Sequence, residues 1–376
     1  MLARLRICSL TKINTPPDAD EIEVALLGRG HGESVVIHAL DGTWIVIDSL
    51  KYENRDAAPL AYLTQMGVGP EAIRVVMATH WHDDHVAGLA QVYSVATNAD
   101  LVLPLAMTTQ EFRAFASIAV GKDMGQLSSG LTEMSDLAAV RKSQARPAPI
   151  RAQASMQIFR ERSSFGHQIC LTAVSPSAAD VEDFLAAISA PHIGSPLVGR
   201  LMPKNPNDIS TACILSMGDE NVLLGADLEV GGRPERGWQA VLTARLNSDP
   251  RASVFKIPHH GSENAHHDSV WSEMLNEEPV CILAPYNRGR GVPKKADADR
   301  IQALTSHAYI TTQSPFRKYR GVSSYVEKSL ESSGIRAQSL PREVGVIRLR
   351  KRISDAKWNV TNFGGAVHLS QFVARD

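Results

Sequence analysis

The sequence predicts an α/β protein in which two β-sheets pack on each other and helices cover both outer faces. Strand-like runs fall into two blocks of the 376-residue chain, and helical segments occur within each block. Sheets built in this way bury one face against each other and the other face under helices. The predicted strands are residues 34–39, 43–48, 73–78, 168–174, 211–217, 222–226, 252–257 and 280–284.

The first block is marked by short apolar runs with turn residues between them. Asp41 and Gly42 separate the first two runs, and this pair predicts a hairpin. A helix bearing alanines and leucines is predicted over residues 57–66 and ends at a glycine. Residues 73–78 form an apolar run bounded by a loop, which is typical of a buried strand, and another helix is predicted to begin at Val86.

The second block returns to strands after a less regular stretch. Helices are predicted over residues 178–189, 236–246 and 296–305. Residues 104–165 are rich in Ser, Gln, Arg and Ala, and we interpret them as a helical insertion or cover. Residues 351–376 are interpreted as a C-terminal extension of a single domain spanning 1–376, a length that one large domain can reach.

The composition is that of an ordinary globular protein, with 44% hydrophobic and 21% charged residues. The formal net charge of −1 gives no overall attraction to nucleic acid or to an anionic membrane, so a polyanion requires a local basic patch. No apolar run approaches the roughly 20 residues that cross a bilayer, and the N-terminal segment is too short and arginine-interrupted for a secretory signal. Four cysteines without a CxxC pair are expected to be mainly buried thiols. These features predict a cytoplasmic protein without a membrane partner.

Three histidines and an aspartate lie within six residues, directly after a predicted strand. His80, His82, Asp84 and His85 offer imidazole nitrogens and a carboxylate, which suit zinc and related transition metals. A tight loop can direct His80 and His82 to one ion, and Asp84 and His85 to a second. The alternative is a polar surface turn, but three of only 13 histidines would then share six positions by chance.

Two further groups of ligand-type residues follow predicted strands in the second block. Asp227 comes after residues 222–226, where a carboxylate can bridge two ions. By itself such an aspartate is more typical of a turn or a helix cap. His259 and His260 follow residues 252–257. Because all three groups stand at strand ends, they favour one metal centre at an edge between the sheets.

The order of these motifs resembles the metallo-β-lactamase superfamily, and within it the ComEC-like branch, the hydrolase domain of competence DNA-uptake proteins. The HxHxDH and HHGS pieces are specific to it, and the other matching pieces are supportive. The matching pieces are residues 30–34, Asp48, residues 79–88, 207–210, 224–227 and 256–262, then Asn287, Gly291 and Pro293, and finally residues 345–349. This resemblance implies the metallo-β-lactamase αβ/βα four-layer sandwich.

The resemblance also implies a ligand set. The implied ligands are His80, His82, Asp84, His85, Asp227 and one histidine of the pair His259 and His260. The spacing in related nucleases favours His260, which leaves His259 to contact the substrate. One or two zinc ions are then the expected cofactor, with manganese as the alternative. Asp84 and His259 are the expected catalytic residues, and Asp84 would orient a metal-bound hydroxide, whose pKa is about 7 on zinc.

One departure from the family pattern concerns the first metal position. The superfamily often supplies another histidine between the HxHxDH motif and the bridging aspartate, but His167 and His192 lack the expected setting. The matching place holds Asn207, Asp208 and Ser210, as in the ComEC-like branch. The first position is then weaker or completed by water, and operation with one metal stays open.

Substrate contacts are expected from residues near these motifs. The candidates are Asn207, Ser210, Ser262, Asn287 and Arg288. Arg288 shares a loop with Arg290, Lys294 and Lys295, whose charges suit phosphate groups. Solvated surface charges are the ordinary interpretation of such a loop.

Together these observations predict a metal-dependent hydrolase. The resemblance implies a phosphodiesterase or nuclease that acts on nucleic acid or a (cyclic) nucleotide by attack of a metal-bound hydroxide, although one metal core serves many reactions. One alternative is a hydrolase of a carboxylic ester, thioester or lactam. Another is a metal-stabilised scaffold or partner-binding protein that uses residues 104–165 as a partner surface. The sequence does not indicate the oligomeric state.

Overall fold

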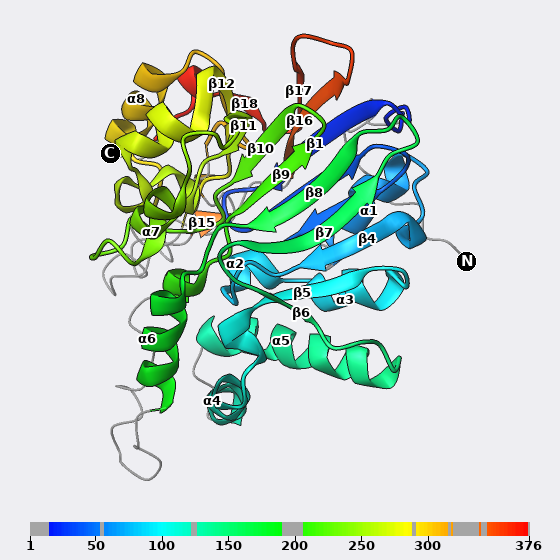
Figure 1. The fold of residues 1–376 in the computed structure, drawn as a ribbon, viewed down its shortest axis with the longest axis vertical. Helices are drawn as coiled ribbons and strands as arrows, with labels where there is room; N and C mark the ends of the chain where they lie inside the picture. Colours follow the sequence, from blue (N-terminus) through cyan, green and yellow to red (C-terminus); the bar gives the residue numbers. More distant parts are fainter. Residues whose placement is uncertain are drawn as a thin grey trace, which may run out of the picture.

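Two eight-stranded sheets lie at the centre of the protein, which we describe from a computed structural model (Figure 1). The structure describes residues 15–52, 56–121, 126–189, 206–287, 291–314, 317–318, 338–339 and 344–374. Helices cover both outer sides of the paired sheets, with α3, α4 and α5 at the bottom of Figure 1 and α7 and α8 at its upper left. The predicted mixed α/β fold with two sheets is confirmed.

The first sheet combines strands from both ends of the chain in the order β17–β16–β1–β2–β3–β4–β5–β6. Its strands are β1 (Glu21–Gly28), β2 (Glu33–Ala39), β3 (Trp44–Ile47), β4 (Ile73–Met77), β5 (Asp100–Pro104), β6 (Ile150–Ala152), β16 (Gly345–Arg352) and β17 (Asn359–Phe363). From β3 to β6 neighbouring strands run parallel, so the carboxyl ends of β3 and β4 open on the same edge.

The second sheet has the order β18–β13–β12–β11–β10–β9–β8–β7. Its strands are β7 (Met156–Arg162), β8 (Gln168–Ala173), β9 (Cys213–Met217), β10 (Glu220–Leu224), β11 (Ala252–Lys256), β12 (Leu275–Leu283), β13 (Ala308–Ile310) and β18 (Val367–His368). Strands β10 to β13 run parallel. The loops that follow β10, β11 and β12 therefore emerge at one edge of this sheet.

Helices and short turns connect these strands. The helices are α1 (Ala58–Gln65), α2 (Asp83–Val86), α3 (Leu89–Val95), α4 (Gln110–Gly121), α5 (Gln126–Ser143), α6 (Ala178–Ser189), α7 (Gly237–Ala244) and α8 (Lys295–Leu304). Two short 3-10 turns, η4 (Pro206–Ile209) and η5 (His259–Gly261), carry residues of the site described below. A separate two-stranded ribbon pairs β14 (Arg317–Lys318) with β15 (Gln338–Ser339).

The hydrophobic core is layered because successive side chains of a strand point to opposite faces. In β1, Val24 and Leu26 lie in the cluster between the two sheets, whereas Ala25 and Leu27 lie in the cluster under the helices of the first half. A third cluster joins the second sheet to Trp238 of α7 and to α8. Since both sheets contribute to the middle cluster, we infer a single domain.

Three predictions about the chain need correction. The helix expected from Val86 begins at Asp83 and is divided at Gly88, whose φ of 88° is left-handed. The predicted helical segment 104–165 contains α4 and α5, but its last part forms β6 and β7, one edge strand for each sheet. The predicted extension 351–376 is part of both sheets, because β17 pairs with β16 and β18 pairs with β13.

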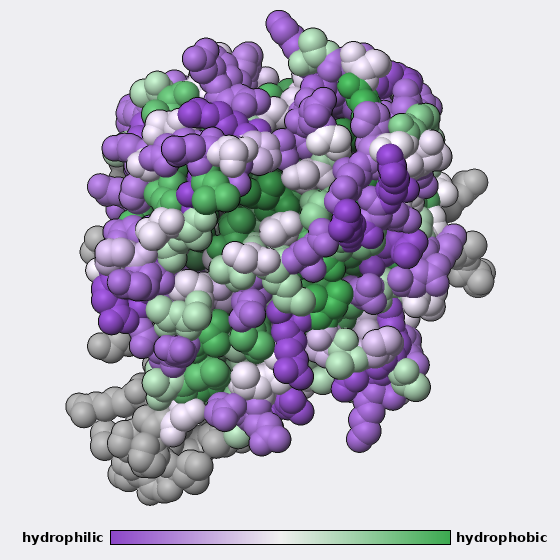
Figure 2. Space-filling view, in the orientation of Figure 1, coloured by the Kyte–Doolittle hydropathy of each residue, from purple (hydrophilic) through white to green (hydrophobic). Residues whose placement is uncertain are grey.

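The surface resembles that of a globular protein. On the face shown in Figure 2, hydrophobic residues form separate patches among polar ones. Among the described residues, no helix is long and apolar enough to cross a bilayer. Cys213 and Cys281 are buried as predicted and Cys170 is partly exposed, while Cys8 lies outside the described residues.

Candidate metal centre

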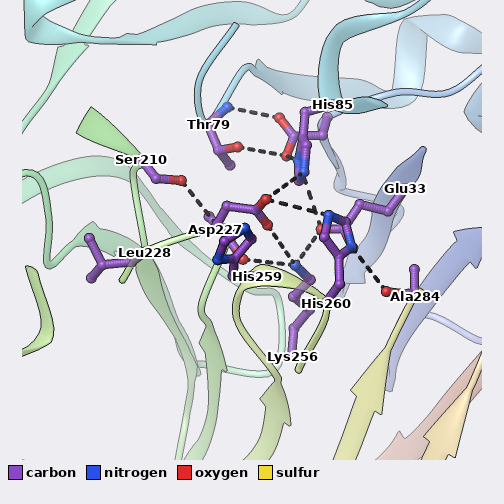
Figure 3. Close-up of polar contacts among 12 residues, drawn as sticks. Glu33, Thr79, His85, Ser210, Asp227, Leu228, Lys256, His259, His260 and Ala284 are labelled. Carbon is purple, nitrogen blue, oxygen red and sulfur yellow. Dashed lines mark hydrogen bonds and ion pairs between the residues drawn. The ribbon is translucent and has the colours of Figure 1, made fainter. Parts of the chain in front are cut away.

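The predicted ligands meet where the two sheets share an edge, because each follows a strand that ends there. The HxHxDH motif follows β4, Asp227 follows β10, and His259 and His260 follow β11. The distant pieces of the sequence pattern are thus brought together by the parallel strands. Figure 3 shows Asp227 between His85, His260 and Lys256.

Asp48, at the end of β3, organises the loop that carries the motif. Its carboxylate accepts hydrogen bonds from the Thr79 backbone N–H at 2.8 Å, the Thr79 hydroxyl at 2.7 Å and Nδ1–H of His85 at 2.7 Å. The Thr79 oxygen in turn accepts from Nδ1–H of His80 at 3.0 Å. The network therefore engages Nδ1 of both imidazoles and leaves Nε2 of both directed away from it, the orientation that metal-ligating histidines have.

The second half of the site is held by backbone contacts. The Asp227 backbone N–H donates to the Ser210 hydroxyl oxygen at 3.0 Å. His260 has a left-handed φ of 55°, and its Nδ1–H donates to the Ala284 carbonyl at 3.0 Å. This bond leaves Nε2 of His260 facing the carboxylates of Asp84 and Asp227.

The donor atoms converge on a small buried volume. Nε2 of His85 lies 3.3 Å from Oδ2 of Asp227 and 3.7 Å from Oδ2 of Asp84. Nε2 of His260 lies 3.3 Å from the same Asp84 oxygen and 3.4 Å from the same Asp227 oxygen. Nε2 of His80 and Nδ1 of His82 are 3.0 Å apart. All six predicted ligands are thus in one cluster, and all except the half-buried His82 are buried.

Two buried polar atoms of this cluster indicate that it suits a cation. Nε2 of His85 and Oδ1 of Asp227 have no hydrogen-bond partner among the described residues. An orphaned buried polar atom costs about 1–3 kcal/mol, so such atoms require an explanation. Imidazole nitrogens and carboxylate oxygens are zinc ligands, and the donor set therefore fits one or two divalent cations. The close groups His80–His85–Asp227 and Asp84–His85–His260 each offer three donors.

Burial and neighbouring charges shift the pKa values of the ionisable groups in this cluster. Burial, together with the neighbouring histidines, holds the pKa of His80 well below its usual value, and burial also lowers the pKa of His82. Burial alone would lower the pKa of His260, but Asp227, Asp84 and Glu33 raise it to about 10. Protonated imidazole thus supplies the positive charge that the carboxylates require. Because a bound cation would take over that charge, metal binding is expected to release protons.

A buried ion pair lies beside the ligands, and no role was predicted for it from the sequence. The Lys256 ammonium contacts the Glu33 carboxylate, and both side chains are only 2% exposed. Lys256 also donates to the Ala226 carbonyl at 2.9 Å and lies 3.8 Å from Oδ1 of Asp227. Both residues belong to matching pieces of the family resemblance, but their pairing follows only from the fold.

A cavity of about 250 Å³ gives access to the cluster. It is lined by Trp81, His82, Asp83, Asp84, Asp227, His259, His260, Tyr286 and Val292. Tyr286 follows β12 and stacks on His260 with ring centroids 5.3 Å apart. Trp81 packs on Phe112 of α4 and Phe184 of α6, each at 5.3 Å between centroids, so these two helices support the side of the cavity that Trp81 lines. Neither Trp81 nor Tyr286 was predicted from the sequence as part of the site.

Comparisons with known proteins point to the family that the motifs resemble. The family model described as the metallo-beta-lactamase superfamily matches residues 27–109, which include the HxHxDH motif. The match and the two-sheet fold support membership of the metallo-beta-lactamase superfamily. The ComEC-like branch is not among these findings and stays a prediction. A search of curated proteins gave no significant match.

Several solved structures are similar to this metallo-beta-lactamase-fold chain at low identity. A HARLDQ-motif mutant metallo-beta-lactamase from Cronobacter sakazakii is 18% identical, with 62% of this chain and 75% of that chain covered and a TM-score of 0.34. The metallo-beta-lactamase fold protein YhfI from Bacillus subtilis is 11% identical, with 77% and 95% covered and a TM-score of 0.38. BJP-1, a subclass B3 metallo-beta-lactamase of Bradyrhizobium japonicum, is 13% identical, with 65% of this chain and 79% of that chain covered and a TM-score of 0.33. Likeness at this level does not extend to substrate.

The predicted substrate residues on η4 have mainly positioning contacts in this metallo-beta-lactamase fold. Asn207 Nδ2 lies 3.2 Å from Nε2 of His259 and 3.0 Å from a Glu229 carboxylate oxygen. Nδ1 of His259 lies 3.0 Å from the Asn264 side-chain oxygen, so both ring nitrogens of His259 have partners. Ser210 is fully buried and holds the Asp227 backbone, so its predicted contact with substrate is corrected to a positioning contact.

Ser262 and Asn287 do not line the described wall of the cavity. Ser262 lines a separate cavity of about 10 Å³, so the predicted contact of Ser262 with substrate is not supported. Asn287 is 7% exposed, and its backbone N–H donates to the Gly30 carbonyl at 2.8 Å. Arg288 lies outside the described residues, as does Arg290. Lys294 stands at the N-terminal end of α8, where its backbone N–H donates to the Asp297 carboxylate at 2.9 Å, and the phosphate-binding role of its loop stays a prediction.

Proposed function

We propose that this protein is a metal-dependent hydrolase that cleaves phosphodiesters, in nucleic acid or in a short or cyclic nucleotide. The observation that carries the metal-dependent part is the convergence of six buried or half-buried residues in one cluster beside the cavity, in which two buried atoms have no hydrogen-bond partner among the described residues. The ligands in this proposal are His80, His82, Asp84, His85, Asp227 and His260. The phosphodiester part rests on the resemblance of residues 207–210 and 256–262 to the ComEC-like branch.

Zinc, or manganese as the alternative, would supply Lewis acidity at this centre, which makes water nucleophilic near neutral pH and offsets charge on the attacked phosphorus. The Asp84 side chain lines the cavity, where its carboxylate can orient the attacking water. Trp81 and Tyr286 restrict the access of bulk water from two sides. Low solvent access strengthens every electrostatic contact with the substrate.

His259 is the proposed proton donor to the leaving oxygen. Its ring lines the cavity, and Asn207 and Asn264 fix its orientation. To donate to a substrate, the ring must be protonated on both nitrogens and must exchange its Asn207 contact for the leaving oxygen. A Glu229 carboxylate oxygen also lies 3.5 Å from Nδ1 of His259.

The test is hydrolysis of bis-p-nitrophenyl phosphate by protein whose zinc or manganese content has been measured. We expect metal-dependent release of nitrophenol that is lost in His82→Ala and retained in His266→Ala, a half-buried histidine outside the cavity. A fully loaded protein that cleaves an ester or a lactam but no phosphodiester would overturn the substrate class. A metal-loaded protein that has no turnover and keeps a partner after chelation would favour the scaffold alternative, and a protein that binds no divalent cation would overturn the metal centre itself.

A further inference from the structure

The two halves of the proposed metal centre have unequal surroundings. We call His80 and His82 the first donor set, and Asp84, His85 and His260 the second donor set. Both sets lie next to Asp227, whose two carboxylate oxygens differ in their contacts. The inequality depends on residues that contact the ligands but do not line the cavity in which the substrate would lie.

Carboxylates support the second donor set. Asp48 accepts from Nδ1 of His85 at 2.7 Å. A Glu33 carboxylate oxygen lies 3.7 Å from Nδ1 of His260, and the other lies 3.8 Å from Nδ1 of His85. An anion behind an imidazole raises the basicity of the opposite nitrogen and so strengthens its bond to a metal. These contacts favour tight binding of a cation by the second donor set.

The first donor set has a less favourable environment. Behind His80 lies the neutral hydroxyl of Thr79, at 3.0 Å from Nδ1. Oδ2 of Asp227 faces the second donor set, whereas Oδ1 lies 3.8 Å from the Lys256 ammonium. Lys256 is 1% exposed, so water does not screen this charge effectively. A fixed positive charge beside Oδ1 disfavours a second cation that shares this carboxylate.

We propose that Glu33 and Lys256 make the two cation positions unequal, so that the second donor set fills first and the first donor set binds weakly. Both are positioning residues, because each acts through a ligand and neither touches the substrate. The inference rests on the proposed metal centre. Its consequence is a one-cation form at low metal concentration and a two-cation form only when metal is abundant.

The order of binding is tested by titrating the metal-free full-length chain with Zn²⁺, and separately with Mn²⁺, in a calorimeter. The unaltered protein is expected to bind in two steps whose affinities differ by at least about 10-fold. His82→Ala should remove the weak step, and His260→Ala should remove the tight step. Loss of the tight step in His82→Ala would show that the order is wrong.

The charge pair is tested by removing both charges together, since one buried charge alone can prevent folding. In Glu33→Gln/Lys256→Met the tight step should weaken and the weak step should strengthen, which reduces the affinity ratio by about 10-fold to 100-fold. The matched control is Glu220→Gln/Lys351→Met, which neutralises a contact at the opposite end of β10. The control should leave the ratio unchanged, and thermal melting shows that both variants fold.

The possible failures of this test are distinguishable. If the unaltered protein binds neither cation, the proposed metal centre itself is wrong. If it binds two cations with equal affinity, or if the ratio in Glu33→Gln/Lys256→Met matches the unaltered value, the metal centre stands and the role of the ion pair is overturned.

Discussion

Two buried charged clusters near opposite ends of β1 differ in how completely their atoms are satisfied. At the start of the strand, fully buried Glu23 accepts hydrogen bonds from the Tyr62 hydroxyl at 2.7 Å and from Nε of Arg350 at 2.6 Å, one on each carboxylate oxygen. Beyond the other end, His85 and Asp227 keep buried atoms without a hydrogen-bond partner among the described residues. In the first cluster, hydrogen bonds to both carboxylate oxygens offset the cost of burying Glu23. In the second cluster, a bound ligand is needed to offset the cost of burying the unpartnered atoms.

This difference means that the two clusters are expected to respond differently to the loss of one charge. The Glu23 cluster contributes to folding, and breaking it should destabilise the protein. The metal-centre cluster is less completely paired, because two of its buried atoms have no hydrogen-bond partner among the described residues until a cation binds. Variants in the Glu23 cluster are therefore expected to change mainly stability, and variants in the metal centre mainly activity.

The largest expected effect is that of Asp227→Asn on hydrolysis. Cations supply several kcal/mol at a reacting centre, and each 1.36 kcal/mol is a factor of ten in rate. Removing the shared carboxylate should therefore reduce metal-dependent kcat/KM by at least about 1000-fold. The melting temperature of the metal-free variant should change little, because His85 and His260 can release their protons once the carboxylate that favours them is gone. A large drop in that melting temperature would contradict the proposed difference between the clusters.

The next effect is that of Arg350→Met on stability. This change leaves the Glu23 carboxylate buried with only Tyr62 as a partner, and breaking a buried pair in this way costs about 3–5 kcal/mol. Urea unfolding measures the loss, while kcat/KM per folded molecule should stay within about twofold. The control is Arg352→Met, whose 41%-exposed guanidinium pairs with Asp20 at the surface, and this change should have little effect on the free energy of unfolding.

The same comparison shows which parts of the site the sequence could predict. The HxHxDH motif, Asp227 and the histidine pair each follow an apolar strand run, so their chemistry and their position at a strand end are both local signals. The Glu23–Arg350 contact joins residues 327 positions apart and has no local signal. The pairing of Glu33 with Lys256 was missed for the same reason, although both residues lie inside matching motifs.

Parts of the fold escaped prediction because tertiary contacts outweigh local pattern at sheet edges. Strand β7 reads Met-Gln-Ile-Phe-Arg-Glu-Arg and is largely polar, but pairing with β8 holds it at the edge of the second sheet. Strands β17 and β18 are short, and β18 relies on β13, a partner far away in the chain. Central strands such as β2, β4, β10 and β11 were predicted because burial on both faces produces continuous apolar runs, whereas β1, which is equally buried, was missed.

The pH dependence of stability also distinguishes the two clusters, because a histidine in each one changes its contribution in the opposite direction. These are His38, near Glu23, and His260, in the metal centre. Burial lowers the pKa of His38, whose ring bonds the Glu21 carbonyl and the Gly42 N–H, from 6.5 to about 4. Its contribution is therefore complete above pH 6.5 and is lost as the pH falls towards 4, a change of about 3 kcal/mol. His260 in the metal-free protein, with a pKa raised to about 10, contributes below pH 6.5 and loses that contribution as the pH rises towards 10.

The measurement is urea unfolding of metal-free protein at several pH values, compared with His38→Gln. The difference in unfolding free energy between the two proteins should shrink between pH 6.5 and 4 and stay constant above pH 7. A constant difference throughout this range would show that His38 does not titrate as its burial requires. His266→Gln, which alters a half-buried histidine elsewhere, is the matched control.

The smallest expected effect tests whether the helical cover acts on the metal centre. Gly130 of α5 lies so close to the motif loop that an added Cβ would overlap the Trp81 carbonyl oxygen. Gly130→Ala should displace Trp81, which lines the cavity, and reduce kcat/KM by about 10-fold to 100-fold, the range expected for a misplacement of about 1 Å. Stability should change little, because the gain of about 1 kcal/mol in helix propensity offsets part of the strain.

Ser143→Ala, at the exposed end of the same helix, is the control for helix propensity and should leave kcat/KM unchanged. If Gly130→Ala keeps full activity, the cover only packs on the loop and residues 104–165 have another purpose. If it loses activity while its melting temperature is maintained, the helical cover positions the loop that carries the metal ligands. Residues 104–165, which contribute no metal ligand, would then influence kcat/KM through the position of the motif loop, and activity would depend on more than the two buried clusters.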